Sequence, residues 1–139
     1  MNNDNVLLAA VAACLIVAML FAAAFLKRRN TPKLNHEYFQ MRWKDLQALC
    51  GDKKTWPLAI IDADKLLDEA LKKSHYKGKT MGERLVTAQR NLSNNDAVWF
   101  AHKLRNKLVH EQHVGLKEAD VKSALIGFRQ ALKDLGALK

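Results

Sequence analysis

The sequence predicts an all-α protein, with an N-terminal transmembrane helix followed by an up-and-down helical bundle. Helix breakers are few, because the 139 residues include only two prolines and six glycines. Residues 6–26 form one uncharged apolar run. Beyond it, apolar residues recur at spacings of three and four, and no segment shows the alternation expected of a strand.

The run from Val6 to Leu26 is long enough to cross a bilayer, which takes about 20 apolar residues. No Lys or Arg precedes it, whereas Lys27, Arg28 and Arg29 follow it directly. Basic residues stay on the cytoplasmic side of a membrane, so we expect the N-terminus outside and the rest of the chain in the cytoplasm. A secretory signal peptide carries its positive charge before the apolar run, so cleavage is disfavoured. We therefore expect a single-pass protein of the plasma (inner) membrane.

The sequence suggests three parts. Residues 1–29 would form the anchor, residues 30–55 a linker and juxtamembrane helix, and residues 56–139 the bundle. Pro32 prevents the membrane helix from continuing. The helix over residues 35–50 can act as a stalk that joins the bundle to the membrane.

Four further helices are expected, over residues 55–74, 80–92, 95–113 and 117–135. Thr55 is expected to cap the first, and Thr80 with Glu83 forms a capping box for the second. The helix over 55–74 has an apolar side formed by Ile60, Ala63, Leu67, Ala70 and Leu71. Its acids are expected to face solvent; they are Asp62, Asp64, Asp68 and Glu69. The final helix has the clearest stripe, formed by Val121, Leu125, Phe128, Leu132 and Leu135.

The chain is basic, with a formal net charge of +9. Because Asp4 is the only charge before Lys27, residues 27–139 carry 23 basic and 13 acidic side chains, a balance of +10. Such a charge suits anionic lipid or nucleic acid. Cys14 and Cys50 are expected in different compartments, so neither a disulfide nor a cysteine-based metal site is predicted.

Chemically useful side chains gather in residues 102–111. On an ideal helix at about 100° per residue, a core stripe forms from Ala97, Ala101, Leu104 and Leu108. The opposite stripe contains His102, Asn106, His110 and His113, and Arg105 lies on the flank. No carboxylate joins the three imidazoles at helical spacing, so we expect no metal ion and no cofactor.

The segment from Arg105 to His110 resembles the Arg-x(4–6)-His motif of HEPN domains, which are small helical bundles. The context is similar too, because the motif lies in the penultimate helix of a bundle. The stretch from Ala59 to Glu83 also looks like uncharacterised bacterial HEPN-like proteins, and the chain is similar to uncharacterised single-pass bacterial membrane proteins. The HEPN resemblance does not extend to the membrane span or to the helix around Trp43. The resemblance covers roughly residues 56–138.

Active HEPN proteins are metal-independent endoribonucleases that usually act as dimers. The resemblance therefore implies RNA as substrate and a homodimer as the working form. His110 would be the general acid or base, Arg105 would hold the phosphate, and Asn106 would orient either group. Imidazole and guanidinium suit these roles because one titrates near neutral pH and the other matches phosphate as a planar fork.

The spacing also raises a difficulty, because residues five apart on an ideal helix are separated by about 140°. A helix irregularity or a twofold dimer would be needed to aim Arg105 and His110 at one phosphate. The alternatives are that Arg105 pairs with Glu111 or with an acid such as Asp62 or Glu69, and that His110 is a capping or core-edge residue. The chain would then be a non-catalytic, membrane-tethered module that binds an unidentified protein.

Overall fold

The structure is a computed structural model that describes residues 3–29 and 32–139, with the side chains of residues 5–24 and 32–139. It confirms the fold class: the described residues are helical without strands, and an apolar N-terminal helix precedes a helical bundle. Two compact units are present, Met1–Pro32 and Lys33–Lys139.

The first unit contains helix α1 (Asn3–Arg29). Its segment Asn5–Ala24 has 20 residues with a mean hydropathy of 2.9, so it is long and apolar enough to cross a membrane. The basic cluster Lys27–Arg29 falls in the last turn of α1, but its side chains lie outside the described ones. Of the expected linker, Asn30 and Thr31 also lie outside the described residues.

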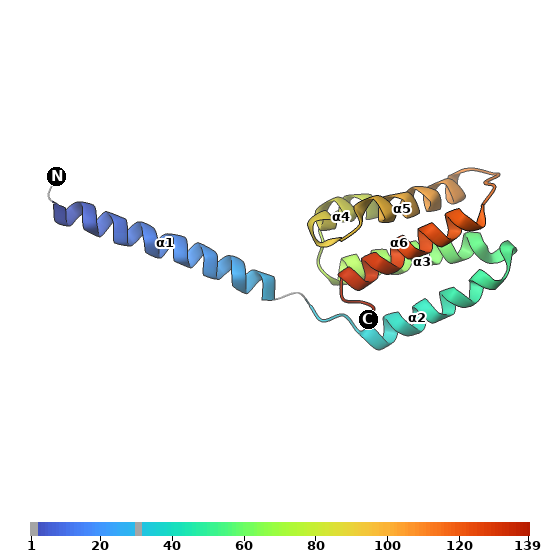
Figure 1. The fold of residues 1–139 in the computed structure, drawn as a ribbon, viewed down its shortest axis with the longest axis horizontal. Helices are drawn as coiled ribbons and strands as arrows, with labels where there is room; N and C mark the ends of the chain where they lie inside the picture. Colours follow the sequence, from blue (N-terminus) through green and yellow to red (C-terminus); the bar gives the residue numbers. More distant parts are fainter. Residues whose placement is uncertain (1–2, 30–31) are drawn as a thin grey trace. The chain divides into compact units, whose positions relative to one another are not determined.

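The second unit is the bundle. Its α-helices are α2 (His36–Ala48), α3 (Trp56–Lys73), α4 (Met81–Ala88), α5 (Asn95–His110) and α6 (Glu118–Asp134). Short 3-10 turns occur at Leu49–Gly51, Lys53–Thr55 and Gln89–Asn91. The four longer helices α2, α3, α5 and α6 run up and down in succession, with the short α4 between α3 and α5 (Figure 1).

Helix α3 is the centre of the bundle, because it contacts α2, α4, α5 and α6. The fully buried large side chains come from every helix of the unit; they are Phe39, Ile60, Leu67, Leu71, Leu85, Val98, Phe128 and Leu132. The expected stripes of α3 and α6 thus form the core, and burial of such side chains is the main favourable term in folding.

Of the two helix caps expected from the sequence, the one at Thr80 forms and the one at Thr55 does not, and Asn94 caps a further helix. Thr80 accepts a hydrogen bond from the backbone N–H of Glu83, as the capping box predicts, although the Glu83 carboxylate accepts from Lys79 rather than from Thr80. Asn94 caps α5 by accepting from Ala97. Thr55 does not cap α3 through its side chain, because its hydroxyl donates instead to backbone carbonyls of the preceding turn.

Helix α2 packs against α3 as part of the same compact unit, whereas the sequence suggested a juxtamembrane helix or stalk. Phe39, Trp43 and Leu46 are buried because α2 lays its apolar stripe on the bundle. The Tyr38 hydroxyl donates to the Glu69 carboxylate at 3.0 Å. This hydrogen bond is the main cause that raises the pKa of Tyr38 above its ordinary value of 10.0, and burial raises it further.

Helix α5 ends at His110, so His113 lies in the connection to α6 and not on the helix as expected. The buried side of α5 is also wider than one stripe. Val98 and Ala101 are fully buried, while Leu104 and Leu108 are half-buried. Because α5 packs against both α3 and α6, two directions on its surface face the core.

Candidate functional site

A buried carboxylate on α3 organises the site. Asp64 is 3% exposed, so the expectation that it faces solvent is wrong. At about 100° per residue, Asp64 falls about 40° from Ile60 and therefore inside the apolar stripe. The signal was present in the sequence, because an acid within an apolar stripe indicates a buried and paired carboxylate.

A histidine on α5 meets this carboxylate. His102 is 8% exposed, so its expected place on the stripe opposite the core is also wrong. It lies one turn after Val98, which is fully buried, and α3 covers this part of α5. His102 Nδ1 is 2.7 Å from Asp64 Oδ1, and the indole of Trp99 packs edge-on against the imidazole at a centroid distance of 5.9 Å.

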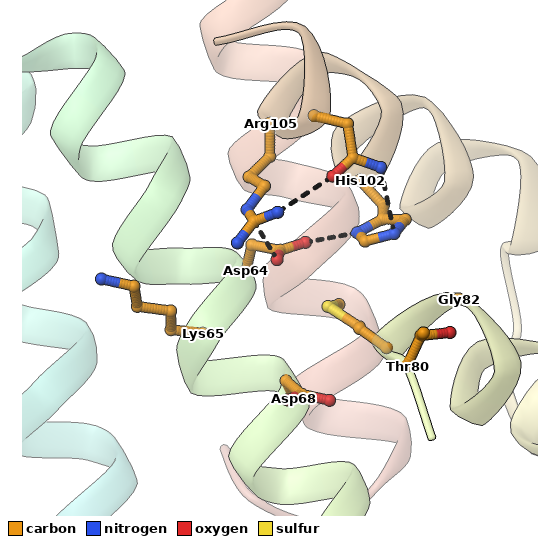
Figure 2. Close-up of a pocket in the computed structure, with 9 residues that line it drawn as sticks. Asp64, Lys65, Asp68, Thr80, Gly82, His102 and Arg105 are labelled. Atoms are coloured by element: carbon orange, nitrogen blue, oxygen red, sulfur yellow. Dashed lines mark hydrogen bonds and ion pairs between the residues drawn. The ribbon is translucent and has the colours of Figure 1, made fainter. Parts of the chain in front are cut away.

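Three helices surround a cavity of about 410 Å³ beside this pair. Its lining side chains are Asp64, Lys65, Asp68, Thr80, Met81, Gly82, His102, Arg105 and Asn106. Figure 2 shows Arg105 and His102 reaching from α5 toward Asp64, with the first residues of α4 beneath them. The structure therefore brings two of the three sequence-predicted residues, Arg105 and Asn106, into one cavity.

Four side chains close a ring of polar contacts at this cavity. Arg105 Nη1 donates to Asn106 Oδ1 at 3.0 Å, and Asn106 Nδ2 lies 3.3 Å from His102 Nε2. Arg105 Nε lies 3.3 Å from Asp64 Oδ2, an ion pair without an aligned hydrogen bond. The partner of Arg105 is thus Asp64, and not Glu111, Asp62 or Glu69, which the sequence offered as alternatives.

A second buried ion pair lies next to the cavity. Arg84 of α4 is 6% exposed, and its Nε and Nη2 each lie 2.7 Å from Asp68 Oδ1. The same guanidinium donates from Nη1 to the Gly78 carbonyl at 2.6 Å. Lys72 contacts the other Asp68 oxygen at 2.7 Å. These contacts fix the start of α4 against α3 and hold the cavity wall in place.

The third sequence-predicted residue, His110, lies elsewhere. It is the last residue of α5, it is exposed, and it does not line the cavity. Asn106 precedes it by one turn on the same face. Within one chain, the motif therefore places its arginine and its histidine in different surroundings.

The arrangement has the parts for acid–base chemistry on an anion. An imidazole held by a carboxylate can accept and donate a proton, and a guanidinium can stabilise negative charge on phosphate. Within the described residues, no cluster of three or more His, Cys, Asp or Glu side chains is placed to hold a metal ion.

Comparison with known proteins adds no family to this picture: no family model, curated protein or solved structure matches the chain.

Proposed function

We propose that this protein is a membrane-anchored, HEPN-like domain that cleaves RNA in the cytoplasm without a metal ion. Arg105 binds the scissile phosphate, Asn106 orients it, and His110 transfers a proton. The observation that carries the proposal is the cavity, where Arg105 and Asn106 lie together beside an imidazole held by a carboxylate.

Two further features support this proposal. The compact unit Lys33–Lys139 carries 20 basic and 13 acidic residues, so its net charge of +7 favours a polyanionic partner. The apolar segment of α1, Asn5–Ala24, and the basic residues after it favour anchoring in the plasma (inner) membrane with the N-terminus outside.

The position of His110 outside the cavity favours a homodimer as the active form. An exposed histidine at the end of α5 can approach the cavity of a second copy, which supplies the motif from two chains. The lipid contact of α1 would raise the local concentration of the two copies in the membrane plane.

RNA cleavage by the full chain in detergent micelles tests the proposal. Cleavage should continue in EDTA and leave a 2′,3′-cyclic phosphate, because attack by the 2′-OH needs no metal. His110→Ala should lower the rate by about 10²–10⁴-fold, the usual contribution of a positioned acid–base group. The matched control is His113→Ala, which removes another exposed imidazole outside α5 and should leave the rate unchanged.

Arg105→Lys is the second variant. The lysine ammonium keeps the positive charge but lacks the planar guanidinium that binds phosphate through two N–H groups at once. We expect a large loss of rate with the bundle still folded. A broad panel of RNAs left intact by a folded and dimeric protein would contradict the proposal.

One observation favours a second function, a non-catalytic module that binds a protein partner. An apolar groove of about 290 Å³ lies between α2 and α6, where Ile126 is 67% exposed. In that function the ring around Asp64 would only hold α3 and α5 together. Ile126→Asp would then abolish partner binding. The protein would leave RNA uncleaved whether Arg105 is present or replaced.

A further inference from the structure

The hydrogen-bond directions in the ring around Asp64 indicate the tautomer of a neutral His102. Arginine is only a donor, so the Asn106 atom that faces Arg105 is the carbonyl oxygen. The amide nitrogen of Asn106 therefore faces His102 Nε2 and donates to it. A neutral imidazole that accepts at Nε2 carries its proton at Nδ1, where it donates to Asp64 at 2.7 Å.

The lone pair of His102 Nε2 thus lies at the cavity that Arg105 and Asn106 also line. A Cβ added to Gly82 would lie 3.9 Å from Nε2, so the start of α4 approaches this nitrogen without blocking it. The other histidines, His36, His75, His110 and His113, are exposed and do not line the cavity.

We infer that His102, and not only the motif histidine, is a catalytic base of this site, and that Asp64 is its positioning residue. The inference rests on the proposed RNA cleavage. When RNA binds, its phosphate replaces the side-chain oxygen of Asn106 on Arg105, and Asn106 turns away from His102. Nε2 is then free to accept the proton of the ribose 2′-OH.

The cleavage reaction requires neither a metal ion nor a redox partner. The 2′-oxygen forms a bond to phosphorus while its proton passes to His102 Nε2. The bond between phosphorus and the 5′-oxygen breaks, and the departing 5′-oxygen takes a proton from His110 of the partner copy or from water. The products are a 2′,3′-cyclic phosphate and a 5′-hydroxyl, and His102 returns its proton to solvent.

The charges around Nε2 favour this role. Asp64, Lys65 and Asp68 line the cavity from α3, and Arg105 lines it from α5. The start of α4 and its N-cap contribute only uncharged residues, Thr80, Met81 and Gly82. Asp68 is already paired with Arg84 and Lys72. The Asp64 carboxylate therefore stabilises the imidazolium that His102 forms at the transition state, and it also fixes the tautomer of His102.

The test compares His102→Ala with wild type and His113→Ala in the RNA assay, with the full chain in detergent micelles. We expect about 10²-fold or greater loss for His102→Ala and partial recovery on addition of imidazole, which a merely structural role would not give. Wild-type rates from a folded His102→Ala variant overturn the inference while leaving the proposed RNA cleavage standing. If wild type cleaves no RNA, the proposed function falls and the inference falls with it.

Asp64→Asn tests the catalytic role of His102 even if the His102→Ala variant does not fold. A neutral amide keeps the shape but no longer stabilises the imidazolium, so the acid limb of the pH–rate profile should move to lower pH. A lower rate with the limb unmoved would assign Asp64 and His102 a structural role and overturn the inference.

Discussion

Buried charges in this bundle are held by more than one partner. The guanidinium of Arg84 contacts Asp68 and the Gly78 carbonyl, and Asp68 also forms an ion pair with Lys72. Asp64 is shared in the same way between His102 and Arg105. Burial of a charge is costly unless it is paired, so loss of one partner leaves the other with an uncompensated charge.

The first stability prediction concerns Asp68→Asn. It should lower the free energy of unfolding by about 3 kcal/mol, because Arg84 stays buried without a counter-charge. The control is Asp62→Asn on the same helix, whose contact with Lys65 is 3.8 Å long and solvent-exposed. That variant should lower the free energy of unfolding by only about 0–1 kcal/mol. Urea unfolding of the full chain in micelles, followed by tryptophan fluorescence, measures both; equal losses would contradict the buried pair.

At the scale of elements, α5 and α6 approach each other closely at Gly127. A Cβ added to Gly127 would lie 2.6 Å from the carbonyl oxygen of Ala97 and 2.8 Å from its carbon, both of which are backbone atoms. Glycine is needed there because a rigid backbone cannot move aside as a flexible side chain can. This approach lets α6 bury Ala124, Phe128 and Leu132.

The second stability prediction is that Gly127→Ala destabilises the bundle, by about 1–3 kcal/mol through overpacking. Helix propensity alone predicts the opposite, a gain of about 1 kcal/mol. Ser123→Ala, at an exposed site on the same helix, controls for propensity and should not destabilise. If both variants gain stability in urea, α5 and α6 do not approach closely at Gly127.

At the scale of the whole molecule, a helix able to cross a membrane and a basic bundle belong to one chain. For the proposed RNA cleavage, the side of the membrane on which the bundle lies matters, because RNA is found in the cytoplasm. The basic residues Lys27, Arg28 and Arg29 in the last turn of α1, which are expected to set this side, are therefore as important to the proposed RNA cleavage as the cavity.

The topology prediction is that the C-terminus lies in the cytoplasm. Green fluorescent protein fused after Lys139 should fluoresce, and alkaline phosphatase at the same point should stay inactive. Replacing Lys27, Arg28 and Arg29 by Gln while changing Asn2 and Asn3 to Lys should reverse both reporters, because the basic residues set the orientation. An active phosphatase on the unaltered chain would place the bundle outside and remove RNA as its substrate.

The sequence alone was sufficient for the fold class, the expected apolar span and the order of the helices. These depend on neighbours along the chain: the apolar spacing of α6, the Thr80–Glu83 cap and the uncharged run after Asn5 are all local patterns. It also predicted a site of Arg105, Asn106 and His110, because the spacing of Arg105 and His110 resembles a family motif.

Only the tertiary structure decided what surrounds those residues. The number of helices that pack against α5 determines how much of its surface is buried, and no pattern within α5 records that number. Contact with α3 therefore turned His102 from an expected surface residue into a buried partner of Asp64, 38 positions away in sequence. The same long-range packing included α2 in the bundle and left His110 outside the cavity, because burial depends on neighbours in space rather than along the chain.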